Sequence, residues 1–225
     1  MRSRPRAAQV GVANDMMGYA SRTGTLANLK ALERAGWRLI VEPSQLSRYG
    51  KKKPSLGYAI DNGAWGCFQR EVPFDEAAFL TMLERYGDDA DWVVVPDIVA
   101  GGLESLRFSE KWLSRLTNLK QPKLLAVQDG MVPADVRGIV GKDVGIFVGG
   151  STDWKLDTLP DWGALARESG AYAHCARVNS VRRIRLCQHA RMDSFDGTSV
   201  TMYSVNIHKL DNARRQQYLL DWRQE

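Results

Sequence analysis

The chain alternates short apolar runs rich in β-branched residues with longer segments in which apolar residues recur every three to four positions. The first pattern is typical of buried strands, and the second is typical of helices that bury one face. The runs predicted to be strands are Ala8–Ala13, Arg38–Glu42, Gly57–Asp61, Trp92–Pro96, Lys123–Gln128, Val144–Val148, Tyr172–Val178 and Met192–Asp196.

Helices are predicted between these strands and after the last of them. Pro133 suits the first position of a helix, and Gly36, Gly87 and Gly170 fall where helices should end. Only the link between the second and third strands lacks a clear helical pattern. The predicted helices are Thr25–Ala35, Asp75–Tyr86, Leu103–Leu116, Pro133–Val140, Leu159–Ser169, Val181–Ala190 and Ile207–Arg223.

The order of these elements predicts an α/β fold. Strands such as Val93–Pro96 and Lys123–Val127 are apolar throughout, as expected for a parallel sheet covered by helices. Eight strand–helix units favour a closed (β/α)8 barrel of the TIM type. The alternative is a doubly wound open sheet, but no G-x-G-x-x-G motif follows the first strand to support it. The chain has 225 residues and no linker, so we expect one compact domain over residues 1–225.

Composition narrows the class of protein without deciding its function. A hydrophobic content of 44% with 25% charged residues is typical of a globular domain, and the net charge of +5 allows a polyanionic partner without requiring one. We expect no membrane segment, because no apolar run reaches about 18 residues. The early arginines resemble those of a signal peptide, but Asn14 and Asp15 interrupt its apolar region, so a cytoplasmic protein is expected. The scattered Cys67, Cys175 and Cys187 favour reduced thiols.

Polar residues follow several of the predicted strands. In a barrel of this type, the carboxyl ends of the strands converge on one face, where the active site is built. Any one Asp-Gly junction is more often a turn than a site, but here the pattern recurs from strand to strand. The segments concerned are Asp61-Asn62-Gly63, Pro96-Asp97, Gln128-Asp129-Gly130, Gly149-Gly150-Ser151 and Asp196-Gly197.

Paired carboxylates at such a mouth suit displacement at the anomeric carbon of a sugar. One carboxylate can attack this carbon while the other handles the proton of the leaving group. Metal-assisted hydrolysis and aldol chemistry fit the same residues nearly as well, and the residues by themselves leave the three alternatives open.

At these same positions, from about Tyr58 to Val200, the chain resembles the tRNA-guanine transglycosylase superfamily. It is most similar to the short, phage-type members that insert 7-deazaguanines into DNA. The family's Asp-Ser-Gly-Gly-Phe and Asp-Met-Phe-Asp motifs resemble Asp61–Trp65 and Asp193–Asp196. Its Val-Gln-Gly and Gly-Gly-Leu-Ser segments resemble Val127–Gly130 and Val148–Ser151.

The resemblance implies a role for each of these residues. Asp196 would be the nucleophile and Asp61 its general acid and base. Trp65, or Phe68 beside it, would stack on the base; the alternative for either ring is an ordinary core role. The residues implied to recognise a guanine-like base are Asp97, Gln128, Gly149 and Gly150.

The chain departs from the tRNA enzymes in its last part. Their zinc-binding subdomain needs three cysteines after the nucleophile, and no cysteine follows Asp196 here. We therefore expect a compact barrel without that subdomain, without a bound metal and without a cofactor. His174, Cys175, Cys187 and His189 suggest a metal site, but positions 187 and 189 of one helix point apart.

The implied partners are DNA and a free 7-deazaguanine base, such as 7-cyano-7-deazaguanine. Arg177, Arg182 and Arg183 lie around the start of the helix after the seventh strand, which is frequently part of a phosphate site in barrels. The alternative for these arginines is a solvated basic surface without a ligand. The alternatives are a tRNA acceptor and a non-catalytic nucleic-acid-binding subunit. Relatives often form homodimers, and a phage-encoded enzyme would act in the cytoplasm of the host.

Overall fold

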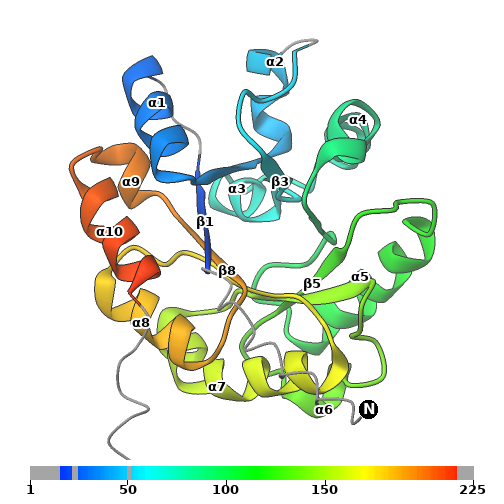
Figure 1. Cartoon of the computed structure of the whole chain (residues 1–225). Helices are drawn as coiled ribbons and strands as arrows, with labels where there is room; N and C mark the ends of the chain where they lie inside the picture. Colours follow the sequence, from blue (N-terminus) through cyan, green and yellow to red (C-terminus); the bar gives the residue numbers. More distant parts are fainter. Residues whose placement is uncertain (1–15, 22–24, 50–51, 217–225) are drawn as a thin grey trace, which may run out of the picture.

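The computed structural model describes residues 16–21, 25–49 and 52–216. Within them the chain forms a closed barrel of parallel strands that follow one another in sequence order, with helices packed around the outside (Figure 1). The strands are β1 (Met17–Ala20), β2 (Arg38–Val41), β3 (Tyr58–Ile60), β4 (Val93–Val94), β5 (Lys123–Val127), β6 (Val144–Val148), β7 (Ala173–Cys175) and β8 (Ser194–Gly197).

The helices lie between the strands and after β8. The two 3-10 turns are η1 (Pro43–Gln45) and η2 (Gly87–Asp89). The α-helices are α1 (Leu26–Ala35), α2 (Leu46–Tyr49), α3 (Ala64–Gln69), α4 (Glu76–Tyr86), α5 (Leu103–Arg115), α6 (Pro133–Val136), α7 (Thr152–Ser169), α8 (Val181–His189), α9 (Ser199–Met202) and α10 (Asn206–Arg215). No helix in this part of the chain is long and apolar enough to span a membrane.

Pairing of the first strand with the last closes the barrel. Tyr19 of β1 lies opposite Asp196 of β8, and Tyr19 also lies opposite Arg38 of β2. Since all the strands are parallel, their carboxyl ends meet at one face, which we call the barrel mouth. The TIM-barrel fold expected from the sequence is therefore confirmed.

Alternation along the strands separates two apolar layers. Tyr19, Ile40, Trp92 and Leu124 form a cluster that fills the inside of the barrel, and a larger cluster lies between the strands and the helices. Residues of one strand alternate between the two layers. This alternation decides which polar side chains near the strand ends can reach the mouth.

The first strand differs from the expectation. The strand predicted over Ala8–Ala13 lies outside the described residues, and the first strand of the barrel is Met17–Ala20. In the sequence, a glycine within such a run indicates a turn. In the structure, Gly18 lies inside the strand because the neighbouring side chain leaves no room for a Cβ atom. A Cβ atom at this position would come within 2.9 Å of the Trp37 ring. The strand accepts glycine because the Trp37 side chain lies against its backbone.

Helix boundaries differ mainly where proline or short length obscures the pattern. Helix α7 begins at Thr152 and not at Leu159, because the exposed Pro160 lies inside the helix instead of starting it. The link from β2 to β3 holds η1 and α2, and α6 ends at Val136 instead of Val140. Helix α3 has no counterpart among the predicted elements, and it lies directly after the first candidate catalytic residue.

Candidate active site

Asp61 leaves β3 and enters helix α3 through a tight polar turn. Its Oδ1 accepts a hydrogen bond from the Gly63 N–H at 2.7 Å, and Asn62 Oδ1 accepts one from the Ala64 N–H at 2.7 Å. Gly63 has φ +81°, and a Cβ atom there would lie 3.0 Å from Pro43. Glycine is therefore needed at this turn, which fixes the carboxyl group of Asp61 at the mouth.

Asn62 joins the ends of β3 and β4. Its Nδ2 donates to the Val95 carbonyl and to Asp97 Oδ1, both at 2.8 Å. Asp97 is thereby held next to the turn that carries Asp61. The sequence predicts these two carboxyl groups at the same mouth, and the buried Asn62 amide is the connection between them.

Two carboxyl groups at the mouth, those of Asp61 and Asp97, have raised pKa values. Burial raises the pKa of Asp61 to about 7, the Gly63 N–H opposes this rise, and the negative charges of Glu42, Asp196 and Asp97 add to it. Burial likewise raises the pKa of Asp97 to about 6, against the hydrogen bond from Asn62. Glu42, at the end of β2, was not singled out from the sequence. An acidic residue after a strand is the signal that could have found it.

Asp196 lies at the end of β8, is 7% exposed, and accepts hydrogen bonds at both carboxylate oxygens. The Arg177 N–H donates to Oδ1 at 2.9 Å, and His174 Nε2 lies 3.1 Å from Oδ2. The same four-residue motif holds Asp193, which accepts from the Ala173 N–H at 2.7 Å at the start of β7. The two aspartates of the motif thus act at different ends of the strand.

His174 supports Asp196 from inside the barrel. Its ring is fully buried, stacks on Phe147 with ring centres 5.0 Å apart, and has Nδ1 2.7 Å from Ser194 Oγ. Burial lowers the pKa of His174, which favours the neutral ring with a single N–H. Since an ionised Asp196 can only accept, this N–H belongs on Nε2, and Nδ1 accepts from the Ser194 hydroxyl. His174 was considered for a metal site, not as a partner of Asp196.

Arg177 crosses the mouth. Its backbone has φ +57°, an uncommon conformation for a residue with a side chain. Its guanidinium donates to the Gly150 carbonyl and lies over the Trp65 ring, 4.7 Å from the ring centre. Trp65 is 43% exposed and stacks on Phe68 with ring centres 5.8 Å apart. The aromatic pair of α3 is thus a half-exposed platform at the mouth, and Arg177 covers part of it.

The residues after β5 and β6 are more enclosed. Gln128 is buried, and its Nε2 donates to the Ile98 carbonyl at 2.9 Å. The Gly149 N–H donates to the Val127 carbonyl at 2.9 Å, so this group is used within the barrel. The Gly150 N–H has no acceptor in the described part of the chain. Of the two glycines, Gly150 is therefore the one whose N–H remains for a ligand.

Gly150 also occupies a position that only glycine fits. It has φ +66°, and a Cβ atom there would lie 2.6 Å from the Trp154 ring and 2.7 Å from Asp129 Oδ2. Asp129 in turn accepts from the Ser151 N–H at 2.6 Å and from its hydroxyl at 2.5 Å. Burial opposes these bonds, but they prevail and lower the pKa of Asp129. Asp129 therefore holds the loop after β6 and is not an acid/base candidate.

The predicted arginine cluster is divided. Arg177 faces the mouth, whereas Arg182 and Arg183 lie in the first turn of α8, where Arg182 is exposed and Arg183 is half-buried. The Ser180 side chain caps this helix by accepting from the Arg183 N–H at 3.3 Å. Arg182 and Arg183 therefore remain candidates for a phosphate contact outside the mouth.

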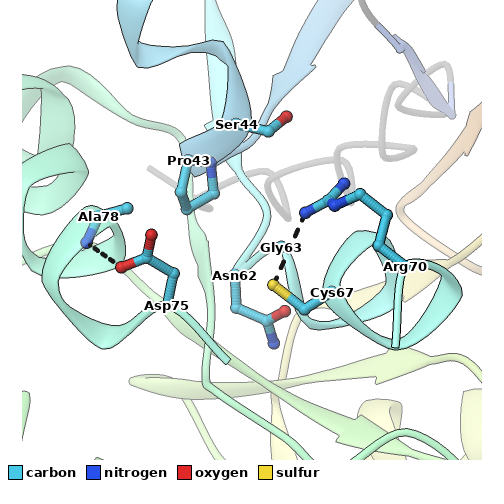
Figure 2. Close-up of a pocket in the computed structure, with 8 residues that line it drawn as sticks. All are labelled: Pro43, Ser44, Asn62, Gly63, Cys67, Arg70, Asp75 and Ala78. Atoms are coloured by element: carbon cyan, nitrogen blue, oxygen red, sulfur yellow. Dashed lines mark hydrogen bonds between the residues drawn. The ribbon is translucent and has the colours of Figure 1, made fainter. Parts of the chain in front are cut away.

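A small pocket opens beside the turn of Asn62 and Gly63. Its volume is about 80 Å³, and it lies among η1, α3 and the start of α4 (Figure 2). Figure 2 shows Cys67 turned toward Arg70, whose Nη2 lies 3.8 Å from the sulfur. The pocket is smaller than the roughly 300 Å³ at which ligand sites usually begin, and Asp61, Asp97 and Asp196 do not line it. This pocket is therefore separate from the carboxyl groups at the barrel mouth.

The residues considered for a metal site point in different directions. His174 faces the inside of the barrel, whereas Cys175 on the same strand belongs to the outer apolar layer with Cys187. His189 is exposed. Among the described residues, no group of three or more His, Cys, Asp or Glu side chains is arranged to hold a metal ion.

Comparisons with known proteins bear on the fold. No protein-family model and no curated protein matches the chain. The structure is similar to the malate synthase of Haloferax volcanii in a lead(II) complex, with a TM-score of 0.52 and 12% identity over 94% of this chain and 77% of that one. It is also similar to the β-methylaspartase of Clostridium tetanomorphum, with a TM-score of 0.52 and 10% identity over 89% of this chain and 58% of that one. Likeness at these identities shows a shared barrel fold.

Proposed function

We propose that the protein is a base-exchange glycosyltransferase that replaces guanine in DNA with a 7-deazaguanine through a covalent link to Asp196. The contrast between two carboxyl groups carries the proposal. Asp196 is held at both oxygens by hydrogen-bond donors, whereas Asp61 has its pKa raised to about 7 by burial. An oriented carboxylate suits a nucleophile, and a carboxyl group that titrates near neutral pH suits a general acid and base.

In the first half of the exchange, a carboxylate oxygen of Asp196 attacks the anomeric carbon of a deoxyguanosine. The bond from that carbon to the guanine nitrogen breaks, and its electron pair leaves with guanine. Protonated Asp61 donates a proton to the departing base. The resemblance of Asp61–Trp65 and Asp193–Asp196 to the motifs of the transglycosylases supports these roles.

In the second half, a nitrogen of the free 7-deazaguanine attacks the same carbon. Asp61, now ionised, accepts the proton of that nitrogen, and the bond to Asp196 breaks. Two displacements on the same carbon return the original configuration. One group with a pKa near 7 can serve as acid in one half and as base in the other at neutral pH.

Recognition of the base is proposed to use three sides of the mouth. Asp97 can accept from the ring N–H and the amine of a guanine-like base, and the Gly150 N–H can donate to its carbonyl. Gln128 can add a second donor if its amide is shared with the Ile98 carbonyl. Trp65 provides a half-exposed face on which a base can stack once the Arg177 guanidinium moves aside.

A DNA acceptor fits the surroundings of the mouth. A base paired in a duplex must be flipped out before its glycosidic carbon can be reached, which costs a few kcal/mol. Contacts with the DNA backbone can offset this cost, and Arg182 and Arg183 at the start of α8 are candidates for them. The net charge of +5 agrees with a polyanionic partner.

The test is incorporation of 7-cyano-7-deazaguanine by the purified protein, measured by mass spectrometry of digested nucleosides. Duplex DNA, single-stranded DNA and tRNA are offered as acceptors. We expect a modified deoxynucleoside, lost in Asp196→Asn and retained in Asp157→Asn, which removes an exposed carboxylate from α7. Modified tRNA alone would favour the tRNA alternative. Failure with all three acceptors would favour a non-catalytic subunit and overturn the proposal.

A further inference from the structure

Lys155 is a buried cation behind the wall of the barrel. It belongs to α7, is 2% exposed, and directs its ammonium group at the Ala176 carbonyl, to which it donates a hydrogen bond. Lysine is almost never fully buried unless it is paired. Because burying an ammonium group costs free energy, the contacts of Lys155 must explain why it lies here.

The carbonyl that Lys155 contacts belongs to the same peptide group as the N–H that holds Asp196. The oxygen of this group is that of Ala176, and its N–H is that of Arg177, which donates to Asp196 Oδ1 at 2.9 Å. One peptide plane therefore lies between a buried cation and the carboxylate. The negative end of its dipole faces the ammonium group, and its positive end faces Asp196.

The backbone conformation next to this peptide shows that its orientation needs support. Arg177 has φ +57°, which non-glycine residues adopt at a cost and keep only where surrounding contacts enforce it. Lys155 holds the peptide at its oxygen and Asp196 holds it at its hydrogen. The Arg177 side chain is anchored separately, on the Gly150 carbonyl across the mouth.

We propose that Lys155 is a positioning residue for Asp196, acting through the peptide between Ala176 and Arg177. It keeps this N–H directed at Oδ1 and strengthens it as a donor, because hydrogen bonds in a chain polarise one another. The proposal rests on the function proposed above, in which Asp196 is the nucleophile.

The electrostatics of the site agree with this arrangement. Burial lowers the pKa of Lys155, the carboxylate of Asp196 acts to raise it, and the Arg177 charge acts to lower it further. The Asp196 carboxylate thus acts on Lys155, although the two side chains lie on opposite faces of the strand layer.

Two substitutions separate the charge of Lys155 from its hydrogen bond. Lys155→Met keeps the length of the side chain and removes both, whereas Lys155→Gln keeps a donor without the charge. Lys123→Met is the matched control, because Lys123 also donates to a backbone carbonyl, that of Leu119 at 3.0 Å, but at the start of β5, away from the mouth.

The first readout is the kinetics of base exchange. We expect kcat to fall up to about 100-fold in Lys155→Met, the size of loss that a small misplacement of a reacting group can cause. The KM for the free base should stay unchanged, because Lys155 contacts neither base nor DNA, and Lys155→Gln should recover part of kcat. An unchanged kcat in Lys155→Met, with Asp196→Asn inactive, would overturn the inference and leave the proposed function standing.

The second readout does not depend on activity. In the nuclear magnetic resonance spectrum of the whole protein, the Arg177 amide proton should move upfield in Lys155→Met and stay in place in Lys123→Met. This comparison can be made even if the wild-type protein shows no base exchange. An absence of exchange would count against the proposed function and not against the contact through the peptide. An Arg177 amide resonance unaffected by Lys155→Met would refute the connection through the peptide.

Discussion

A raised pKa at Asp61 requires the stability of the protein to fall as pH rises, and Asp61→Asn should remove this dependence. The ordinary pKa of the side chain is 3.8, and burial at the mouth raises it to about 7. Between these values the folded protein keeps a proton that the unfolded chain has lost. The free energy of unfolding of the wild type therefore decreases with pH over this window.

The size of the effect follows from the two pKa values. Each pH unit over which only the folded state keeps the proton lowers the free energy of unfolding by about 1.4 kcal/mol. Between pH 5 and pH 8 this difference persists for about two pH units, up to the pKa of about 7. The loss of wild-type stability attributable to Asp61 is thus up to about 3 kcal/mol, with solvent screening of this half-buried group reducing it. Asparagine is nearly the same shape, and its Oδ1 can still accept from the Gly63 N–H.

The assay is urea unfolding of the wild type and Asp61→Asn at pH 5 and pH 8. We expect the variant to gain up to about 3 kcal/mol on the wild type between the two conditions. Asp157→Asn, which removes an exposed carboxylate from α7, should run parallel to the wild type and controls for the lost charge. If Asp61→Asn also ran parallel to the wild type, the raised pKa of Asp61, on which the proposed acid/base role depends, would be refuted.

The other predictions concern supporting positions. Ser194→Ala, which removes the hydroxyl from the barrel histidine, should lower kcat about tenfold, as expected for one hydrogen bond of about 1.4 kcal/mol; an unchanged kcat would refute its role. Gly150→Ala should lower the free energy of unfolding, measured in urea, by about 1 to 3 kcal/mol. Gly138→Ala is the control, because no atom lies within 4 Å of its new Cβ, and equal losses of stability in the two variants would contradict the packing argument. Replacing Arg182 and Arg183 with alanine should reduce the slope of log affinity for DNA against log salt by about two, measured by fluorescence anisotropy, and an unchanged slope would remove them from the interface.

Several features could be read from the sequence because they depend on local pattern. Apolar runs such as Lys123–Val127 predicted the strands, and Asp61, Asp97 and Asp196, which lie at or near the carboxyl ends of strands, predicted the mouth. A parallel barrel brings all such positions to one face, so that the end of a strand is enough to place a residue there. Their chemical roles remain predictions, since proximity alone does not assign them.

Other features were decided only by the tertiary structure. Whether His174 meets Asp196 depends on the register between β7 and β8, and whether Lys155 meets the Ala176 carbonyl depends on how α7 packs against the strands. For Lys155, the sequence offers one indication of burial, because this lysine precedes the buried Leu159 by one helical turn. The sequence by itself thus determined the barrel and the carboxylates at its mouth, because alternation and strand order act locally along the chain. The partners that orient Asp196 come from residues distant in sequence, and only the closed barrel brings them together.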